Sequence, residues 1–442
     1  SKSRAKGAAL KALKMLKRME ELHRSGMNVR PNVISYTLVI AALGASGEPE
    51  KAEKILDRMF LISKNNRDAR PNEKTFYTCI TAWAKSGAPD AAERAETVLN
   101  RMEEMYLGLQ LQQPSNDTDA DAASVKNVAA RPNVLCYNAV LNAYATSGGR
   151  NSAKMAQNIL ERMERLTAKE IMDVSPDIVS YNTCLNAWAK SSSEDALVMA
   201  ERLVQHMKDQ YNVVGNIDAK PDIITYNTLL TAYGRRSSSD EDALQRILEI
   251  LADMEEQYTS GVDETMRPSA ITYNNAINAF AKSTVAGKAK QAQMILESMK
   301  RSYDSGNLDA KPNLFAFTSV MNACAYTKGD QDETLEALKI LWSTFNDLCD
   351  NASDYGGPNH VTYITLLKAL RDLMPMSNER DEITKKVFQR CIRDGEVNQK
   401  VLVILKSALP LDDFRTITGG DSTSRDSIPA EWKRNVHKRH KV

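Results

Sequence analysis

The chain has 442 residues, and its 58 Lys and Arg nearly balance its 57 Asp and Glu, giving a formal net charge of +1. Hydrophobic residues make up 42% of the chain and charged residues 26%, a composition that excludes disorder as its main state. No run approaches the roughly 18 consecutive apolar residues that a membrane-spanning helix needs, so the sequence predicts no membrane insertion.

The first element is a basic N-terminal arm with a half repeat, which we place at residues 1–30. This arm carries nine Lys or Arg against two acids, and residues 429–442 carry five against one. The body between the two ends is therefore acidic, with 44 basic against 54 acidic side chains. A general cationic surface for nucleic acid is excluded in the body, where any polyanion site has to be formed locally.

From residue 31 onward one pattern recurs: a Pro, then Asn, Asp or Ser, then three residues and an aromatic residue. Each unit continues through a helical segment such as 178–191, a polar break, and a second helical segment ending in Met, such as 196–207. We interpret each unit as a helical hairpin. The eight prolines that open the units are Pro31, Pro71, Pro132, Pro176, Pro221, Pro268, Pro312 and Pro358.

The units share one register. When the second residue after each of these prolines is counted as position 1, position 4 is always aromatic, position 8 is Ile, Leu or Met, and position 10 is always Ala. At 100° per residue, positions 4, 8 and 11 lie within about 60° of one another, so we expect a buried stripe. The constant Ala predicts close approach of neighbouring helices. Stacked hairpins of this kind form an all-α solenoid.

The repeat array occupies 31–374 and contains a polar loop insertion at about 106–131. Residues 375–410 are interpreted as C-terminal capping helices, and residues 411–442 as a linker and basic tail. The six cysteines form no C-x-x-C pair, and neither a Gly-rich phosphate loop nor clustered carboxylates appear. The sequence therefore predicts no catalytic residue, no metal, no cofactor and no small-molecule substrate.

The residues of two units, PDIVSYNTCLNAWAKS (176–191) and PDIITYNTLLTAYGRR (221–236), each with an Ala-rich helix ending in Met after it, resemble pentatricopeptide repeats. The resemblance covers about 31–374 and a half repeat in 8–30. It implies an α-solenoid superhelix of about eight helix-turn-helix repeats. Most units here are longer than the family's repeat, chiefly after the Met, so we expect wider turns or longer second helices.

Positions 2, 5, 9 and 13 lie roughly 100–180° from position 4 and form a lengthwise stripe away from the core. Position 2 is apolar in seven units, position 5 is Asn or Thr in six, and position 13 is basic in four. Such a row suits a single-stranded nucleotide, because the apolar side chain can stack on the base, the amide can bind the base edge and the cation can pair with the phosphate. We assign base stacking to Ile34, Leu135, Val179, Ile224, Ile271, Phe315 and Val361, and phosphate binding to Lys85, Lys190, Arg235 and Lys282.

The resemblance further implies that single-stranded RNA is bound with one base per repeat, read by position 5 together with the residue just before the next repeat. Adenine would be read by Thr37 with Asn72 and by Thr318 with Asn359. Uracil would be read by Asn138 with Asp177 and by Asn182 with Asp222. Cytosine would be read by Asn227 with Ser269, and either pyrimidine by Asn274 with Asn313. Tyr77 and Ile364 fit no pairing. The predicted ligand is 5′-A-n-U-U-C-Y-A-3′, parallel to the chain.

Structural explanations exist for each of these residues. The Asn, Asp and Ser residues ahead of the helices are good N-caps, and capping is compatible with base reading. The amides of position 5 could form a ladder of hydrogen bonds between neighbouring repeats. The apolar residues of position 2 could be ordinary packing, and the cations of position 13 could be solvated.

The resemblance implies a non-enzymatic RNA-binding protein of an organellar matrix. The mitochondrion is favoured over the plastid stroma, or equally with it, as the location. It would stabilise, process or present a transcript. The alternative is a structural subunit of a large organellar ribonucleoprotein, such as a mitochondrial or plastid ribosome, with ribosomal RNA and proteins as partners. A protein scaffold without RNA is a third interpretation.

Overall fold

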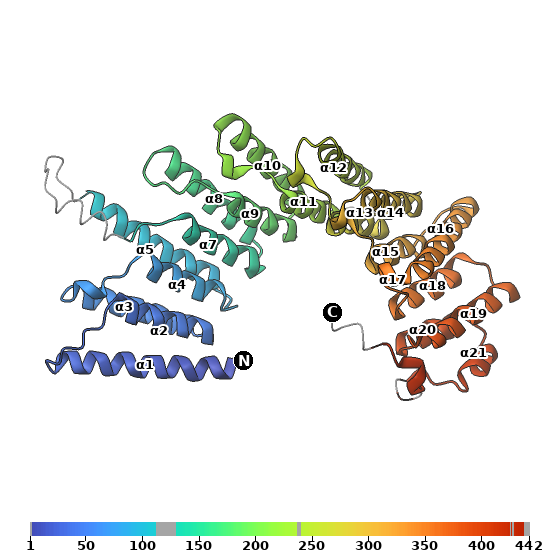
Figure 1. The fold of residues 1–442 in the computed structure, drawn as a ribbon, viewed down its shortest axis with the longest axis horizontal. Coiled ribbons are helices and arrows are strands. Elements are labelled where there is room, and N and C mark those ends of the chain that lie inside the picture. The colour runs from blue at the N-terminus through green and yellow to red at the C-terminus, as the bar shows by residue number, and fades with distance from the viewer. Residues whose placement is uncertain (1, 112–129, 237–239, 425, 427, 437–442) are drawn as a thin grey trace. The chain divides into compact units, whose positions relative to one another are not determined.

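The structure is a computed structural model that describes residues 2–111, 130–236, 240–424, 426 and 428–436, and these residues form helices without a strand (Figure 1). The predicted all-α fold is confirmed. The chain divides into two units, Ser1–Pro221 and Asp222–Val442. Within each unit, helical hairpins follow one another along the chain, and the first helix of one hairpin packs beside the first helix of the next.

The first unit contains eight hairpin helices, an N-terminal helix and three short helical turns among its described residues. The first helices of its hairpins are α2, α4, α7 and α9. In chain order its elements are α1 (Lys2–Arg24), α2 (Val33–Ser46), α3 (Pro49–Ser63), η1 (Arg67–Ala69), α4 (Glu73–Ala84), α5 (Ala91–Leu111), α7 (Val134–Ser147), α8 (Ser152–Ala168), α9 (Ile178–Lys190), α10 (Ala196–Asp209), η2 (Gln210–Val214) and η3 (Ile217–Ala219).

The second unit continues the hairpins with first helices α11, α13, α15 and α18. Its described elements are α11 (Ile223–Arg236), α12 (Glu241–Thr259), η4 (Glu264–Met266), α13 (Ala270–Lys282), α14 (Lys288–Asp304), η5 (Leu308–Ala310), α15 (Leu314–Ala325), α16 (Gln331–Asp350), α17 (Ala352–Tyr355), α18 (His360–Leu373), α19 (Asn378–Asp394), α20 (Gln399–Ala408), α21 (Leu411–Thr418) and η7 (Ala430–Lys433).

The loop predicted at about 106–131 begins later than expected, because α5 continues through Leu111. Residues 106–111 have the sequence Tyr-Leu-Gly-Leu-Gln-Leu. Leu and Gln have high helix propensity, so the helix continues here despite Gly108. Residues 112–129, the remainder of that prediction, lie outside the described residues, as do 437–442 of the predicted basic tail. In the 375–410 segment, α19 packs against α18, and α20 packs against both.

Side-chain caps explain where the first helices begin. The Asn72 side chain accepts a hydrogen bond from Thr75 N over 3.0 Å, and Asp177 accepts one from Ser180 N over 2.8 Å. Each bond satisfies a backbone N–H that has no partner inside the helix. At the other end of α2, Gly47 has φ of 78°, a left-handed conformation that glycine adopts without a Cβ penalty.

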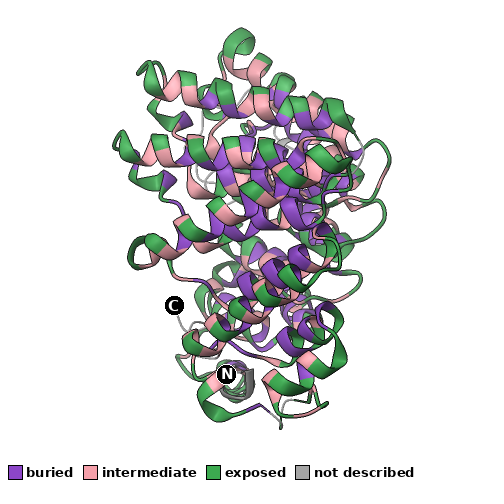
Figure 2. Cartoon of the chain, turned by 90° about the vertical axis from the view of Figure 1, so that its right-hand side faces the viewer, coloured by how far each residue is buried: buried purple, intermediate pink, exposed green. Residues whose placement is uncertain are grey.

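The predicted stripe is buried. Tyr36, Phe76 and Tyr137 at position 4 have no exposed surface, and Trp83 at position 11 is 1% exposed. Buried residues lie where helices face one another, and exposed residues lie on the outer turns (Figure 2). The methionines that close the second helices are also fully buried: Met59, Met102, Met163, Met207, Met254 and Met299.

The constant Ala does allow neighbouring first helices to approach closely. Gly44 at position 12 of α2 faces Ala82 at position 10 of α4, and a Cβ added at Gly44 would lie 2.8 Å from the Ala82 Cβ. In the second unit Gly234 faces Ala279 in the same register, with a 3.5 Å separation for the same added atom. The close approach predicted from position 10 is confirmed at both places.

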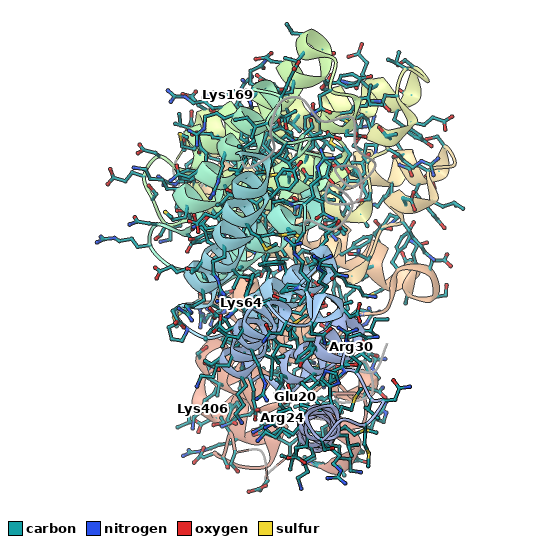
Figure 3. The ribbon with its side chains drawn as sticks, turned by 90° about the vertical axis from the view of Figure 1, so that its left-hand side faces the viewer. Glu20, Arg24, Arg30, Lys64, Lys169 and Lys406 are labelled. Atoms are coloured by element: carbon teal, nitrogen blue, oxygen red, sulfur yellow. The ribbon has the colours of Figure 1, made fainter. Side chains whose placement is uncertain are left out.

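Buried carboxylates join successive hairpins through the tyrosines of position 4. Glu20 of α1 is labelled in Figure 3. Tyr36 Oη donates to it over 2.9 Å, and Glu20 also pairs with Arg58 of α3. Tyr137 donates in the same way to Glu103 over 2.5 Å, and Arg162 completes that cluster. Each carboxylate is at most 7% exposed, so both of its partners compensate for the cost of burying charge.

Candidate nucleic-acid interface

The apolar residues of position 2 are exposed in both units. Ile34, Leu135 and Val179 of the first unit are 63%, 57% and 53% exposed. Ordinary packing therefore does not account for them. The remaining members of the row belong to the second unit and have exposures between 44% and 63%: Ile224, Ile271, Phe315 and Val361.

The residues just ahead of each first helix do act as N-caps. Besides Asn72 and Asp177, Asp222 accepts from Thr225 N over 2.9 Å, Asn313 from Ala316 N over 3.0 Å, and Asn359 from Thr362 N over 3.1 Å. Capping uses one side-chain oxygen of each residue. Ser269 differs, because its hydroxyl lies 3.3 Å from the Thr272 hydroxyl and its own N–H donates to Thr272 Oγ1 over 3.0 Å.

In the first unit, position 5 contacts the cap of the next hairpin. Asn138 Nδ2 donates to Asp177 Oδ1 over 3.1 Å, and Ser180 Oγ donates to Asn138 Oδ1 over 2.6 Å. Thr37 Oγ1 lies 2.9 Å from Thr75 Oγ1, which donates to Asn72 Oδ1 over 2.9 Å. The predicted readers Asn138 and Asp177 are therefore brought together directly, and Thr37 and Asn72 through Thr75.

The second unit shows one contact of the same kind. Thr318 Oγ1 lies 3.4 Å from Thr362 Oγ1, which donates to Asn359 Oδ1 over 3.2 Å. Oδ1 of Asn227 and Oδ1 of Asn274 are instead buried and have no hydrogen-bond partner among the described residues. Among the amides of position 5, Asn138 thus makes the hydrogen bonds between neighbouring repeats that were the alternative, and the hydroxyls of Thr37 and Thr318 make similar contacts.

Burial divides the predicted readers into two classes. Thr37 and Thr318 are 7% and 8% exposed, so their hydroxyls are poorly accessible to a ligand. The four asparagines, Asn138, Asn182, Asn227 and Asn274, are only partly buried. Asn182 belongs to the first unit and its predicted partner Asp222 to the second, so their pairing stays a prediction.

The predicted phosphate ligands Lys85, Lys190, Arg235 and Lys282 are all exposed. Lys282 lines a pocket of about 480 Å³ at the C-terminal ends of α13 and α15, together with Lys288, Lys328 and Tyr326. Lys368 Nζ lies 3.6 Å from the centroid of the Tyr326 ring, close enough for a cation–π contact. Four lysines of the second unit, Lys282, Lys288, Lys328 and Lys368, thus lie around Tyr326.

Lys288 differs from the other lysines of this group, because it is 3% exposed and its ammonium donates to Ser283 O over 2.8 Å. Burial lowers its pKa below the usual lysine range. Lys288 therefore supports the wall of the pocket, whereas Lys282 and Lys328 are free to reach a ligand.

Neither a metal centre nor a membrane span is found among the described residues. No three His, Cys, Asp or Glu side chains lie close enough together there to hold an ion. No helix in that part of the chain combines the length and apolar character needed to cross a membrane. All six cysteines are free thiols, and burial raises the pKa of Cys136 and of Cys324 to about 12.

Sequence models of known families match several of the hairpins. A pentatricopeptide repeat model matches residues 34–61, and a pentatricopeptide repeat domain model matches 124–191, 166–236 and 212–283. The matched hairpins are pentatricopeptide repeats. The matched segments include the units whose residues carry the resemblance, and no curated protein sequence matches the chain.

Solved structures of the pentatricopeptide repeat protein PPR10 are similar to this one at low sequence identity. The protein PPR10 from maize is 17% identical with a TM-score of 0.36, covering 92% of this chain and 61% of its own. PPR10 in complex with an 18-nucleotide psaJ RNA element is 17% identical with a TM-score of 0.33, covering 88% of this chain and 55% of its own. The chain thus spans less than two thirds of the length of these PPR10 chains.

Two groups of residues on the repeat face were missed by the sequence analysis. Lys328 lies two residues beyond position 13, and Lys368 occupies position 9, where the other units carry Ala, Thr or Asn. A count of cations restricted to position 13 could not find them. The second group surrounds Asn398, the N-cap of α20, which accepts from Val401 N over 2.9 Å as the caps of the repeats do.

Proposed function

We propose that this protein binds single-stranded RNA along the exposed stripe of its first helices, with one base for each repeat. The observation that carries the proposal is the row of exposed apolar side chains at position 2, which stands one helical turn from position 5. An aliphatic or aromatic plate beside a polar side chain offers a base both a stacking surface and an edge partner. Single exposed apolar side chains are common on protein surfaces, so it is the recurrence at one register in seven repeats that points to a binding surface.

Asn138 and Asp177 give the clearest reading pair. Their mutual hydrogen bond and the cap occupy Oδ1 of Asp177, and the second carboxylate oxygen, Oδ2, takes part in neither bond. This oxygen would accept the N3–H of a uracil that stacks on Val179 or Leu135. We therefore retain 5′-A-n-U-U-C-Y-A-3′ as the ligand, with its uracil positions set by Asp177 and Asp222.

The mechanism is occupation of the strand. A bound strand is held extended, so nucleases and its own base pairing are excluded while no bond in the RNA is changed. The protein would act in an organellar matrix, mitochondrial or plastid, to stabilise, process or present a transcript. The lysines around Tyr326 would supply counter-charge that the acidic body otherwise lacks.

Equilibrium binding of the full chain to AAUUCUA-containing RNA and to a scrambled control, at near-physiological salt, tests this proposal. Clear preference for the predicted strand supports it, and Ser269→Asp should move the preference of the fifth slot from cytosine to uracil. Weak binding that falls steeply with salt and does not depend on sequence would overturn it.

The second candidate is a structural subunit of a large organellar ribonucleoprotein. The burial of Thr37 and Thr318 favours it, because two of the six predicted reading pairs depend on hydroxyls that are already bonded inside the protein. In that case Asn138→Ala, Asn182→Ala, Asn227→Ala and Asn274→Ala combined would leave assembly intact. If the chain reads bases, the same variant would lose strand binding.

A further inference from the structure

A pocket of about 520 Å³ lies in the second unit, beside the last of the eight predicted slots. Val361 and Ile364 of α18 form one wall, and Val397 and Asn398, just ahead of α20, form another. The C-terminal segment 428–436 supplies Ile428 and Val436. Five of its ten lining residues are thus aliphatic, and the other five are His360, Asn398, Gln399, Lys400 and Lys433.

The helix α20 repeats the register of the first helices. Asn398 caps it, Leu402 stands at position 4 and is 2% exposed, and Ala408 stands at position 10 and is 2% exposed. Helix α20 also packs beside α18, as successive first helices do. Ile364 at position 5 and Asn398 ahead of the next helix thus occupy the two places where the other repeats carry their reading pair.

The C-terminal segment is held over this slot by backbone hydrogen bonds. Val397 N donates to Trp432 O over 2.8 Å, and Asn435 N donates to Gly395 O over 3.0 Å. The Trp432 ring lies edge-on to Phe388 of α19, with 5.9 Å between their centroids. The segment therefore closes one side of the pocket with residues that lie outside the repeat register.

We propose that this pocket binds the base at the eighth position of the RNA, immediately 3′ of the last predicted adenine, and prefers a purine. The proposal rests on the proposed function. Because Ile364 has no hydrogen-bonding group, the slot cannot read a base edge from position 5. Aliphatic walls stabilise a base in proportion to the area they cover, and a purine presents more area than a pyrimidine.

The charge around the pocket fits the same occupant. Lys400 and Lys433 both line it, so cations stand beside the aliphatic side chains of the chamber. A nucleotide has this division of character, with an apolar ring face and an anionic phosphate. The recognised strand becomes 5′-A-n-U-U-C-Y-A-R-3′, in which R is chosen by shape.

Binding of the full chain to 5′-AAUUCUAN-3′ tests the pocket, with A, G, U, C or an abasic residue at the last position. The expected result is about tenfold weaker binding for the abasic strand than for A or G, with U and C between them. Ile364→Asn creates the Asn and Asn combination of Asn274 and Asn313, so it should reverse the preference toward pyrimidines. Val403→Asn is the matched control, since it lies at position 5 of α20, outside the pocket.

A second readout and a second variant protect the test against misfolding. A 2-aminopurine at the eighth position should change its emission on binding to the parent protein and to Val403→Asn. The change should be smaller with Val436→Ala, which enlarges the pocket from the C-terminal segment without altering α18. Thermal melting of each variant shows whether it is folded.

The outcomes separate the two proposals. If AAUUCUA is preferred to the scrambled strand but the eighth base has no effect, the pocket proposal is wrong and the proposed function stands. If a pyrimidine is preferred by the parent protein, the purine assignment is overturned. If no strand is preferred at all, the proposed function fails and the pocket assignment fails with it.

Discussion

Asn138 donates a hydrogen bond from Nδ2 to Oδ1 of Asp177 over 3.1 Å, and its own Oδ1 accepts from Ser180 Oγ over 2.6 Å. Both ends of this amide are therefore paired inside the first unit. Asn274 occupies the same position of its repeat in the second unit, yet its Oδ1 is buried without a hydrogen-bond partner. Ala316 stands where Ser180 stands in the first unit, so the hydroxyl that could donate to Asn274 is absent.

This difference predicts opposite effects of one substitution on stability. Asn138→Ala should lower the free energy of unfolding by about 1–2 kcal/mol, because two hydrogen bonds are lost and Ser180 loses an acceptor. Asn274→Ala should be neutral or stabilising by up to about 1 kcal/mol, because it removes a buried oxygen that lacks a hydrogen bond to compensate for its loss of hydration. Urea denaturation measures both. Equal costs would show that the two amides have the same environment.

The same two variants separate stability from recognition. If position 5 reads bases, both substitutions should weaken binding of the predicted RNA to a similar degree, although only Asn138→Ala lowers stability. Binding that falls with Asn138→Ala alone would mean that the amide acts only by holding the repeats together.

The approach of neighbouring first helices predicts a second matched pair. Gly44→Ala should lower the free energy of unfolding by about 1–3 kcal/mol, because the new methyl group would lie 2.8 Å from the Ala82 Cβ, which cannot rotate away. Gly234→Ala places its methyl group 3.5 Å from Ala279, an ordinary contact, so the better helix propensity of Ala should stabilise by up to about 1 kcal/mol. Thermal unfolding of both variants checks this, and a gain in both would contradict the close approach at Gly44.

The repeats could be predicted from the sequence, because the N-cap and the buried positions of each first helix depend on residues within that helix. Asn72 and Asp177 cap helices whose aromatic residue follows four positions later, and that spacing does not vary. The capping function of Asn398 was harder to recognise, since Val397 replaces the proline and Leu402 the aromatic residue.

Contacts between hairpins could not be predicted, because their sequence separation varies. Tyr36 and Glu20 are 16 residues apart, whereas Tyr137 and Glu103 are 34 apart, with the insertion between them. The burial of Thr37 could not be predicted either, because helical periodicity places position 5 only relative to its own helix. The next hairpin covers that side chain through Thr75.

One of these contacts between hairpins predicts a pH dependence. Glu164 accepts from Tyr181 Oη over 2.7 Å and lies 2.7 Å from His206 Nε2. The hydrogen bond with Glu164 raises the pKa of His206 above its usual value, against the opposing effect of burial. A raised pKa contributes stability that is complete below the unfolded value, about 6.5, and is lost as the pH rises through the folded pKa.

His206→Gln should therefore melt at a lower temperature than the parent protein near pH 6, and this difference should shrink toward pH 9. Thermal melts across that range measure it. His23→Gln is the control, because His23 is exposed near the end of α1 and has no carboxylate partner among the described contacts. A difference that grows with pH would reverse the sign of the linkage and contradict the assigned ion pair.

The lysines around Tyr326 predict how RNA binding responds to salt. Lys282 and Lys328 line the same pocket on the repeat face, so each is placed to neutralise a phosphate. For single strands, each phosphate contact contributes about 0.7 to the slope of log affinity against log salt. Lys282→Ala and Lys328→Ala should each reduce the slope by about that amount and weaken all sequences alike. Lys290→Ala is the matched control, since Lys290 lies on α14 and pairs with Glu336 over 3.5 Å. If Lys290→Ala changes the slope as much as Lys328→Ala does, the phosphates do not follow the stripe of first helices.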